Sequence, residues 1–207
     1  MGYTVLARTE YKLYIANKRR KLINETPTII SNNCIGGIIC HDLGIEFQSP
    51  FVNIGIMVPE YIKILQNLPK YMSTPFEERG EMSDGWPTVK WGDAWMLFAH
   101  ESSLKTSLDK WEHRKSRINY DNLFVIMTDQ MGCTYEHLQV FDALPYRNKV
   151  VITHRYYPEI KSSFYLKGFE DKPQVPIMSA WKPGFWKRRQ LDDFDYVSFL
   201  NGEGIKR

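Results

Sequence analysis

Cysteine is scarce in this chain of 207 residues, which has only Cys34, Cys40 and Cys133. No two of them form a C-x-x-C pair, and an odd number leaves one thiol unpaired in any set of disulfides. This spacing excludes the disulfide framework of small secreted proteins and gives no thiolate zinc site. We therefore expect free thiols and no metal site. No cofactor is expected either, because no phosphate-binding fingerprint is complete.

Long apolar runs, internal repeats and low-complexity tracts are also lacking. A membrane-spanning helix needs about 18 or more apolar residues in a row, and a secretory signal needs an apolar stretch after its basic start. Neither pattern occurs. The chain is nonetheless 43% hydrophobic and 14% aromatic, which suffices for one packed core with a cleft. These features predict one globular protein located in the cytoplasm.

Positive charge is concentrated at the N-terminus. The first 21 residues hold six basic residues against Glu10, a net charge of 6 − 1 = +5, so the overall charge of +3 leaves −2 for the rest. We predict a basic helix within residues 1–25 and a single α/β domain over 26–207. The helix is either solvated or in peripheral contact with an anionic membrane surface, and its basic residues fall on several sides. No nucleic acid partner is expected.

Apolar runs alternate with helical patterns along the chain. Strands that are apolar throughout, rather than at every second residue, are typical of a parallel sheet covered on both faces. We therefore predict an α/β fold, with a largely parallel sheet and helices on both faces. The expected strands are 28–30, 95–99, 123–127 and 150–152; the expected helices are 4–24, 34–43, 59–71, 101–118, one capped by Thr134 and one from Leu191, with a surface loop over 73–87.

Polar residues follow each of these predicted strands. In open parallel sheets, ligands bind outside the carboxyl ends of the strands, so these residues are expected to converge on one edge. They are Asn32, Asn33 and Cys34 after the first strand, His100 and Glu101 after the second, Thr128 and Asp129 after the third, and Thr153 and His154 after the fourth.

Cys34 is the candidate nucleophile at this edge. It would sit at a helix N-terminus, where unpaired N–H groups and the helix dipole favour a thiolate. His100 or His154 would act as the general base, and Asp129 would orient it, as in cysteine and serine hydrolases. The alternative is structural, since Asn, Asp and His are common in turns and free cysteine is often buried.

The same turn also permits binding without covalent chemistry. Gly36 and Gly37 lack a Cβ, so a ligand can approach the backbone beside Asn32 and Asn33. Close packing of the helix on the sheet explains the two glycines equally well.

Two arginines on the helix after His100 are further candidates. Arg114 and Arg117 lie about 60° apart around the helix, close enough to hold one anion, and Asn119 follows them. The alternatives are a solvated helical face for the arginines and a helix C-cap for Asn119.

Several motifs together resemble a bacterial family of unknown function whose members are often labelled exopolysaccharide biosynthesis proteins. The similarity covers about residues 26–165 and implies a setting in surface-polysaccharide synthesis. The motifs are SNNCIGG at 31–37, SP at 49–50, WGD at 91–93 with FAH at 98–100, and WEHRKSRIN at 111–119.

The strand followed by S-x-x-C, with a later F-x-H, is more distantly similar to a family proposed to be papain-like cysteine peptidases. That resemblance implies Cys34 as nucleophile and His100 as base. The glutamine that such peptidases carry ahead of the nucleophile is missing here.

Two hypotheses about function follow. The first is an enzyme of surface-polysaccharide biosynthesis, a transferase or hydrolase acting on a carbohydrate-related small molecule that bears a sugar, acyl or phosphate group. Cys34, His100 and Asp129 would do the chemistry, while Asn32, Asn33 and Arg114 would hold the substrate. The second is a non-catalytic module that binds an anionic glycan precursor or a protein partner.

Overall fold

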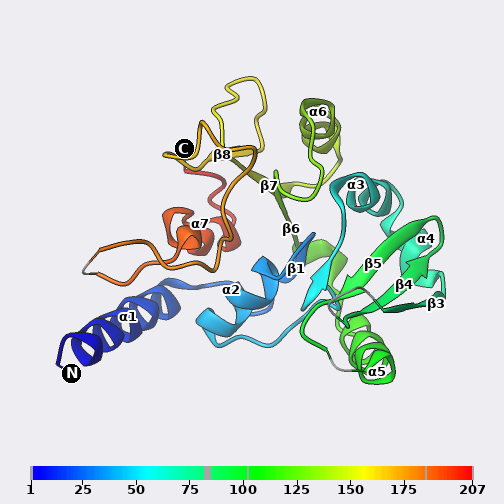
Figure 1. Cartoon of the computed structure of the whole chain (residues 1–207), viewed down its shortest axis with the longest axis horizontal. Coiled ribbons are helices and arrows are strands. Elements are labelled where there is room, and N and C mark those ends of the chain that lie inside the picture. Colours follow the sequence, from blue (N-terminus) through cyan, green and yellow to red (C-terminus); the bar gives the residue numbers. More distant parts are fainter. Residues whose placement is uncertain (1, 82–84, 102, 185, 207) are drawn as a thin grey trace.

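The computed structural model describes residues 2–81, 85–101, 103–184 and 186–206. Helices and strands are interspersed along the chain (Figure 1). The α-helices are α1 Gly2–Lys21, α2 Ile35–Leu43, α3 Val58–Gln66, α4 Leu68–Ser73, α5 Leu104–Lys115, α6 Tyr135–Ala143 and α7 Tyr196–Leu200, with 3₁₀ turns η1 Tyr120–Asn122 and η2 Gln190–Asp193. The strands are β1 Thr28–Ser31, β2 Ile54–Gly55, β3 Phe76–Glu81, β4 Pro87–Trp91, β5 Ala94–Phe98, β6 Leu123–Thr128, β7 Asn148–Thr153 and β8 Ser163–Tyr165. Consecutive elements of one kind are α3 and α4, β3 to β5, and β7 and β8.

A parallel sheet forms the centre of the molecule, in the order β1-β6-β7-β8. Ile30 pairs with Val125, Ile126 with Val150, and Ile152 with Phe164. The predicted strands 28–30, 123–127 and 150–152 are confirmed within β1, β6 and β7. Every residue of β1 and β6 is buried, which is the reason for their continuous apolar sequences.

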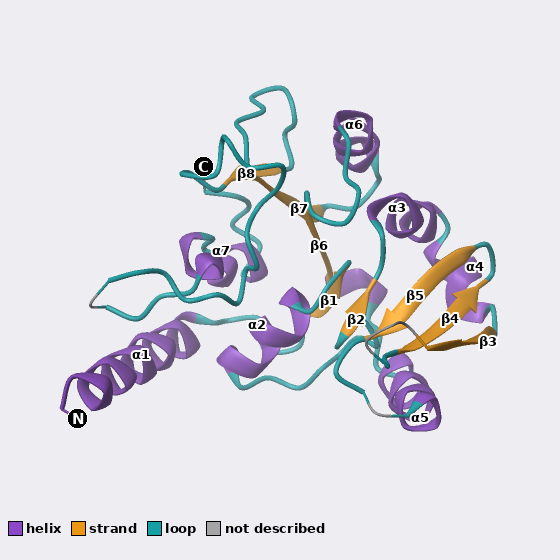
Figure 2. Ribbon diagram, viewed as in Figure 1, coloured by secondary structure: helices purple, strands orange, loops and turns teal. Residues whose placement is uncertain are grey.

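A second sheet is antiparallel, in the order β2-β5-β4-β3 (Figure 2). The prediction of one largely parallel sheet is therefore wrong for half of the strands, and the predicted surface loop over 73–87 contains β3. The strand expected at 95–99 exists as β5, but it pairs antiparallel with β4 through a two-residue turn at Gly92 and Asp93. Gly92 has a positive φ of 63°, as tight hairpin turns require.

Some helices begin and end at the residues expected from sequence. Gly44 adopts the left-handed conformation that ends α2, and the Thr134 side chain caps α6 as predicted. The single helix expected over 59–71 is instead α3 and α4, because the backbone leaves helical geometry at Asn67 (φ −139°). The helix expected over 101–118 is the shorter α5.

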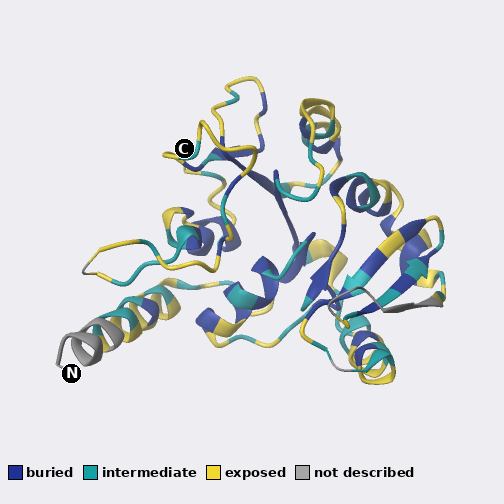
Figure 3. Ribbon diagram, viewed as in Figure 1, coloured by how far each residue is buried: buried dark blue, intermediate teal, exposed yellow. Residues whose placement is uncertain are grey.

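The central strands contribute to two separate hydrophobic clusters (Figure 3). Ile30 and Val125 pack in a cluster with residues of α3, α6 and the antiparallel sheet. Ile29 and Ile126, one position away on the same strands, pack with residues of α2 and α7. Because successive side chains of a strand point to opposite faces, the parallel sheet separates the two clusters.

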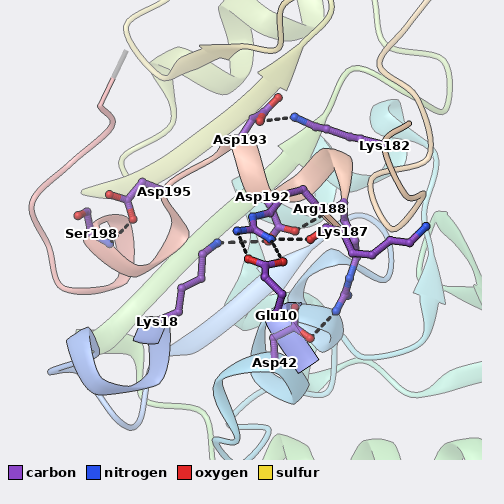
Figure 4. Close-up of polar contacts among 11 residues, drawn as sticks. Glu10, Lys18, Asp42, Lys182, Lys187, Arg188, Asp192, Asp193, Asp195 and Ser198 are labelled. Carbon is purple, nitrogen blue, oxygen red and sulfur yellow. Dashed lines mark hydrogen bonds and ion pairs between the residues drawn. The ribbon is translucent and has the colours of Figure 1, made fainter. Parts of the chain in front are cut away.

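The basic helix α1 docks on the C-terminal segment (Figure 4). Arg188 makes two hydrogen bonds to the Glu10 carboxylate, at 2.7 and 2.8 Å. Lys18 lies 3.3 Å from Asp192 and 3.7 Å from the centre of the Tyr196 ring. Part of the helix's positive charge thus serves intramolecular contacts. Contact with an anionic membrane stays a prediction. Over the described ranges, no helix is both long enough and apolar enough to cross a membrane.

Candidate functional site

Side chains of the turn after β1 hold the start of α2. Ser31 Oγ donates to the Asn33 carbonyl (2.7 Å) and accepts from the Gly36 N–H (3.1 Å). Asn33 Oδ1 accepts from the Ile35 N–H (3.1 Å). These bonds satisfy two N–H groups that a helix cannot pair internally. The turn therefore fixes Cys34 as the N-cap of α2.

Cys34 lines a cleft of about 390 Å³. Its partly buried thiol donates to the Ile54 carbonyl across 3.9 Å. Burial raises the pKa of the Cys34 thiol, opposite to the lowering expected from a helix N-terminus alone, so the resting thiol is neutral near pH 7. The residues that line the cleft are Asn33, Cys34, Ile35, Ile38, Asn53, His100, Gln130, Ile177, Met178 and Ser179.

His100 faces the same cleft from the other sheet. It follows β5, is exposed, and its ring packs edge-on against Trp86 with the ring centres 5.0 Å apart. The expectation that it follows a strand of the parallel sheet is wrong, because β5 belongs to the antiparallel one. The fold nevertheless brings His100 and Cys34 to one cavity from two sheets.

Unusual backbone conformations surround this cavity. The non-glycine residues with positive φ, within the described segments, are Asn53 (57°), His100 (62°) and Met131 (59°). Asn53 and His100 line the cleft, and Met131 follows the cleft residue Gln130. Such conformations are uncommon and are concentrated at functional sites, where the surrounding structure holds them in place.

Asn33 and Gln130 form the rigid frame of the cleft. Asn33 Nδ2 donates to Thr128 Oγ1 (3.0 Å), and Gln130 Nε2 donates to the carbonyls of Val175 and Pro176 (both 3.0 Å). These bonds join the ends of β1 and β6 to the segment that carries the cleft residues 177–179. Both amides are thus already engaged in the protein.

Other polar side chains in the cleft remain available to a ligand. For Asn53, His100 and Ser179, the described part of the chain offers no hydrogen-bond partner to the side chain. Asn53, Gln130 and residues 177–179 were not among the sequence candidates. Gln130 directly follows Asp129 after a predicted strand, and this position could have marked it as a candidate. The sequence around Asn53 carries no such signal, because the position of Asn53 depends on its backbone conformation.

Asp129 and His154 form a separate, closed pair. Nδ1 of His154 lies 2.5 Å from Oδ2 of Asp129, which also accepts from the His154 N–H (2.7 Å). Oδ1 accepts from the Val175 N–H (2.8 Å). Asp129 is 6% and His154 8% exposed, and neither lines the Cys34 cleft. Asp129 thus orients His154 as one alternative expected, but it does not contact His100.

Two predicted ligand-binding asparagines have structural contacts. Asn32 is fully buried; its Oδ1 accepts from the Thr128 N–H (3.2 Å) and its carbonyl accepts from the Ile56 N–H (2.9 Å). Asn119 caps the 3₁₀ turn that follows it, accepting from the Asp121 N–H (3.0 Å), rather than ending α5.

The two glycines of α2 lie at close packing contacts. A Cβ on Gly36 would come within 2.9 Å of Ser31 Oγ and 3.1 Å of Ile29 Cγ2. A Cβ on Gly37 would come within 3.2 Å of Val52 Cγ1. All three distances are tighter than ordinary van der Waals contact, so close approach of α2 explains the glycines without a ligand.

Arg114 of α5 and Arg117, which follows this helix, differ in their contacts. Arg117 pairs with Glu46 (2.8 Å) and donates to the Phe47 carbonyl (2.9 Å). Arg114 lies over the Phe47 ring, 5.1 Å from its centre, and lines a second cavity beside Gly37. Arg114 therefore faces a cavity, whereas Arg117 is engaged by Glu46 and the Phe47 carbonyl.

No group of three or more His, Cys, Asp or Glu side chains with metal-binding geometry occurs in the part of the chain that the structure describes.

Comparison with known proteins gives the family. Residues 6–201 match the model of a domain of unknown function, DUF1919. The chain belongs to this family. It is also 40% identical over 183 residues to a Haemophilus influenzae strain Rd protein described as uncharacterized, covering 88% of each chain. The expected membership of a domain-of-unknown-function family is thus confirmed.

Proposed function

We propose that this DUF1919 protein is a cysteine-dependent acyltransferase or hydrolase acting on a carbohydrate-related small molecule. The observation that carries the proposal is that Cys34 and His100, from different sheets, line one cleft with a strained backbone. A thiol beside an imidazole is the pairing that nucleophilic catalysis by cysteine uses. The resemblance to proteins labelled for exopolysaccharide biosynthesis supports a role in surface-polysaccharide assembly, which we place in the cytoplasm.

The proposed reaction has two steps. Cys34 Sγ attacks the carbonyl carbon of an ester or thioester donor while His100 accepts the thiol proton. The bond to the leaving group breaks, the leaving group takes that proton from His100, and the acyl group stays on sulfur. A sugar hydroxyl or water then attacks this thioester and gives its proton to His100; the sulfur–carbon bond breaks, and the proton returns to Cys34.

The raised pKa of Cys34 assigns a definite task to His100. A buried neutral thiol is a weak nucleophile, so its proton must leave during the attack. The His100 side chain is exposed and packs against Trp86, so in this mechanism it turns toward Sγ when a substrate enters.

The cleft suits a small hydroxylated substrate. Its volume of about 390 Å³ lies within the usual range for small-molecule sites. Asn53 and Ser179 supply unengaged polar groups, and Ile38 and Met178 supply apolar wall. Sugars present this combination of hydroxyl groups and apolar C–H faces.

Acylation by p-nitrophenyl acetate tests the proposal. We expect acetylation of Cys34, mapped by peptide mass spectrometry. This acetylation should be absent in Cys34→Ser. Added glucose should accelerate the breakdown of the acetylated protein. Cys40 and Cys133 in the same sample are internal controls, because burial raises the pKa of each to about 12. Acetylation of those two thiols without Cys34 would contradict the proposal.

A second candidate is a non-covalent binding site for a glycan precursor. The observation that favours it is the Cys34 thiol itself, which is neutral and donates to the Ile54 carbonyl. Under this alternative Cys34→Ser retains ligand binding and function, whereas the covalent mechanism requires that Cys34→Ser abolishes turnover.

A further inference from the structure

A second cavity of about 300 Å³ adjoins the cleft. Ile38 and Asn53 line both cavities, so the two cavities are neighbours separated by these residues. The second cavity also includes Gly37, Phe47, Arg114 and Arg189.

Arg114 is the unmatched charge in this second cavity. Its guanidinium lies over Phe47, and no ion pair or side-chain hydrogen bond to it occurs within the described segments. Glu101 attracts Arg114 without contacting it, and its carboxylate is bound to Lys110 at 2.8 Å. Burial lowers the pKa of Arg114, as expected for a cation that has lost water without a directly bonded anion.

The other cations near it are already paired. Arg117 bonds to Glu46, and Arg189 lies 2.6 Å from Asp42. Arg189 still lines the cavity, so Arg114 and Arg189 border the same space. A planar arginine fork is well matched to phosphate oxygens, and a phosphate has enough oxygens for two forks.

We infer that the Arg114 cavity binds the phosphate group of a sugar phosphate whose sugar lies in the Cys34 cleft. The inference rests on the proposed function for the sugar's place, and adds the charged group that the substrate carries. Asn53, which lines both cavities, lies where the sugar and the phosphate meet.

Calorimetric titration with glucose 1-phosphate tests this inference. We expect the wild-type chain to bind it at least about tenfold more tightly than glucose. Arg114→Gln should lose about tenfold or more in affinity, and Arg114→Lys, which keeps the charge and the stem over Phe47, should lose less. Lys115→Gln is the matched control, because Lys115 pairs with Glu112 and lines neither cavity.

Two further titrations separate this inference from the proposed function. Inorganic phosphate should bind more weakly than glucose 1-phosphate, and its binding should also depend on Arg114. Cys34→Ser should bind glucose 1-phosphate as wild type does, so a failure of the covalent mechanism leaves this result intact. Two results would overturn the inference. One is absence of glucose 1-phosphate binding to the wild type; the other is that folded Arg114→Gln and Arg114→Lys both bind it as tightly as the wild type does.

Discussion

Two histidines of this protein follow strand ends and differ in nearly every respect. His154 follows β7 of the parallel sheet, is buried, and is bonded to Asp129 by both its ring and its backbone N–H. His100 follows β5 of the antiparallel sheet, is exposed, and has a left-handed backbone. The comparison shows that the polar side chains after β6 and β7 hold the fold together, whereas the histidine after β5 stays exposed, with no hydrogen-bond partner for its side chain in the described part of the chain.

The largest effect on stability is expected from the closed pair. Asp129→Ala removes the acceptor for the His154 ring and for two backbone N–H groups, leaving buried donors unsatisfied. We expect a loss of about 3–5 kcal/mol in the free energy of unfolding, measured by urea denaturation. His100→Ala, the matched change on the open side, should stay within about 0.5 kcal/mol. Equal losses of unfolding free energy in Asp129→Ala and His100→Ala would contradict the distinction between a structural and an open histidine.

Acetylation of Cys34 should show the reverse order, with the larger loss in His100→Ala than in Asp129→Ala. In the proposed mechanism His100 accepts the Cys34 proton, so His100→Ala should slow acetylation of Cys34 by p-nitrophenyl acetate by about a hundredfold or more. Trp95→Ala is a suitable control, since this exposed residue of the same strand lines neither cavity. Unchanged acetylation in His100→Ala would show that the open histidine has no part in the reaction.

Packing beneath the turn should give a smaller effect. In Gly36→Ala, the new Cβ meets Ser31 Oγ and Ile29 at distances that force a shift, so we expect about 1–3 kcal/mol of destabilisation. In Gly37→Ala, the single contact with Val52 is offset by improved helix propensity, and the net change should be below about 1 kcal/mol. Thermal unfolding of both variants measures the difference, and the opposite order would argue against close packing as the reason for Gly36.

The smallest effect is expected at the docking contact of α1. Arg188 lowers the pKa of the Glu10 carboxyl through its hydrogen bonds, so the stabilisation is present above the unfolded pKa and is lost as the pH falls through the folded one. Because the pair is partly exposed, Glu10→Gln should cost at most about 1 kcal/mol near pH 7 and less near pH 3. Denaturation at both pH values gives the measurement; a cost that is the same at the two would refute the ion pair as its source.

The parallel sheet was largely predictable from sequence, and the antiparallel one was not. β1, β6 and the last four residues of β7 are buried, so each contains a recognisable apolar run. In the antiparallel sheet β4 begins at Pro87 and alternates buried with half-buried residues, and in the parallel sheet β8 has only three residues. Neither presents a run long enough to stand out from a loop.

Only some residues of the candidate site were predicted from sequence, and its construction was not. Cys34 and His100 were both named, on the assumption that one parallel sheet carries them. Their proximity depends instead on how the antiparallel sheet sits against the turn at Asn32 and on backbone conformations such as that of Asn53. Sequence patterns report strands and helices; they do not report which loop lies opposite another.

The rate at which iodoacetamide alkylates each cysteine measures whether Cys34 and His100 act together. It should be followed by mass spectrometry between about pH 6 and pH 10, in the wild type and in His100→Ala. If His100 serves Cys34 as base, alkylation of Cys34 near pH 7 should exceed that of Cys133 and fall about tenfold or more in His100→Ala, with Cys133 unchanged. If Cys34 reacts at the same rate in both proteins across the whole pH range, Cys34 and His100 do not work together and the covalent mechanism is wrong.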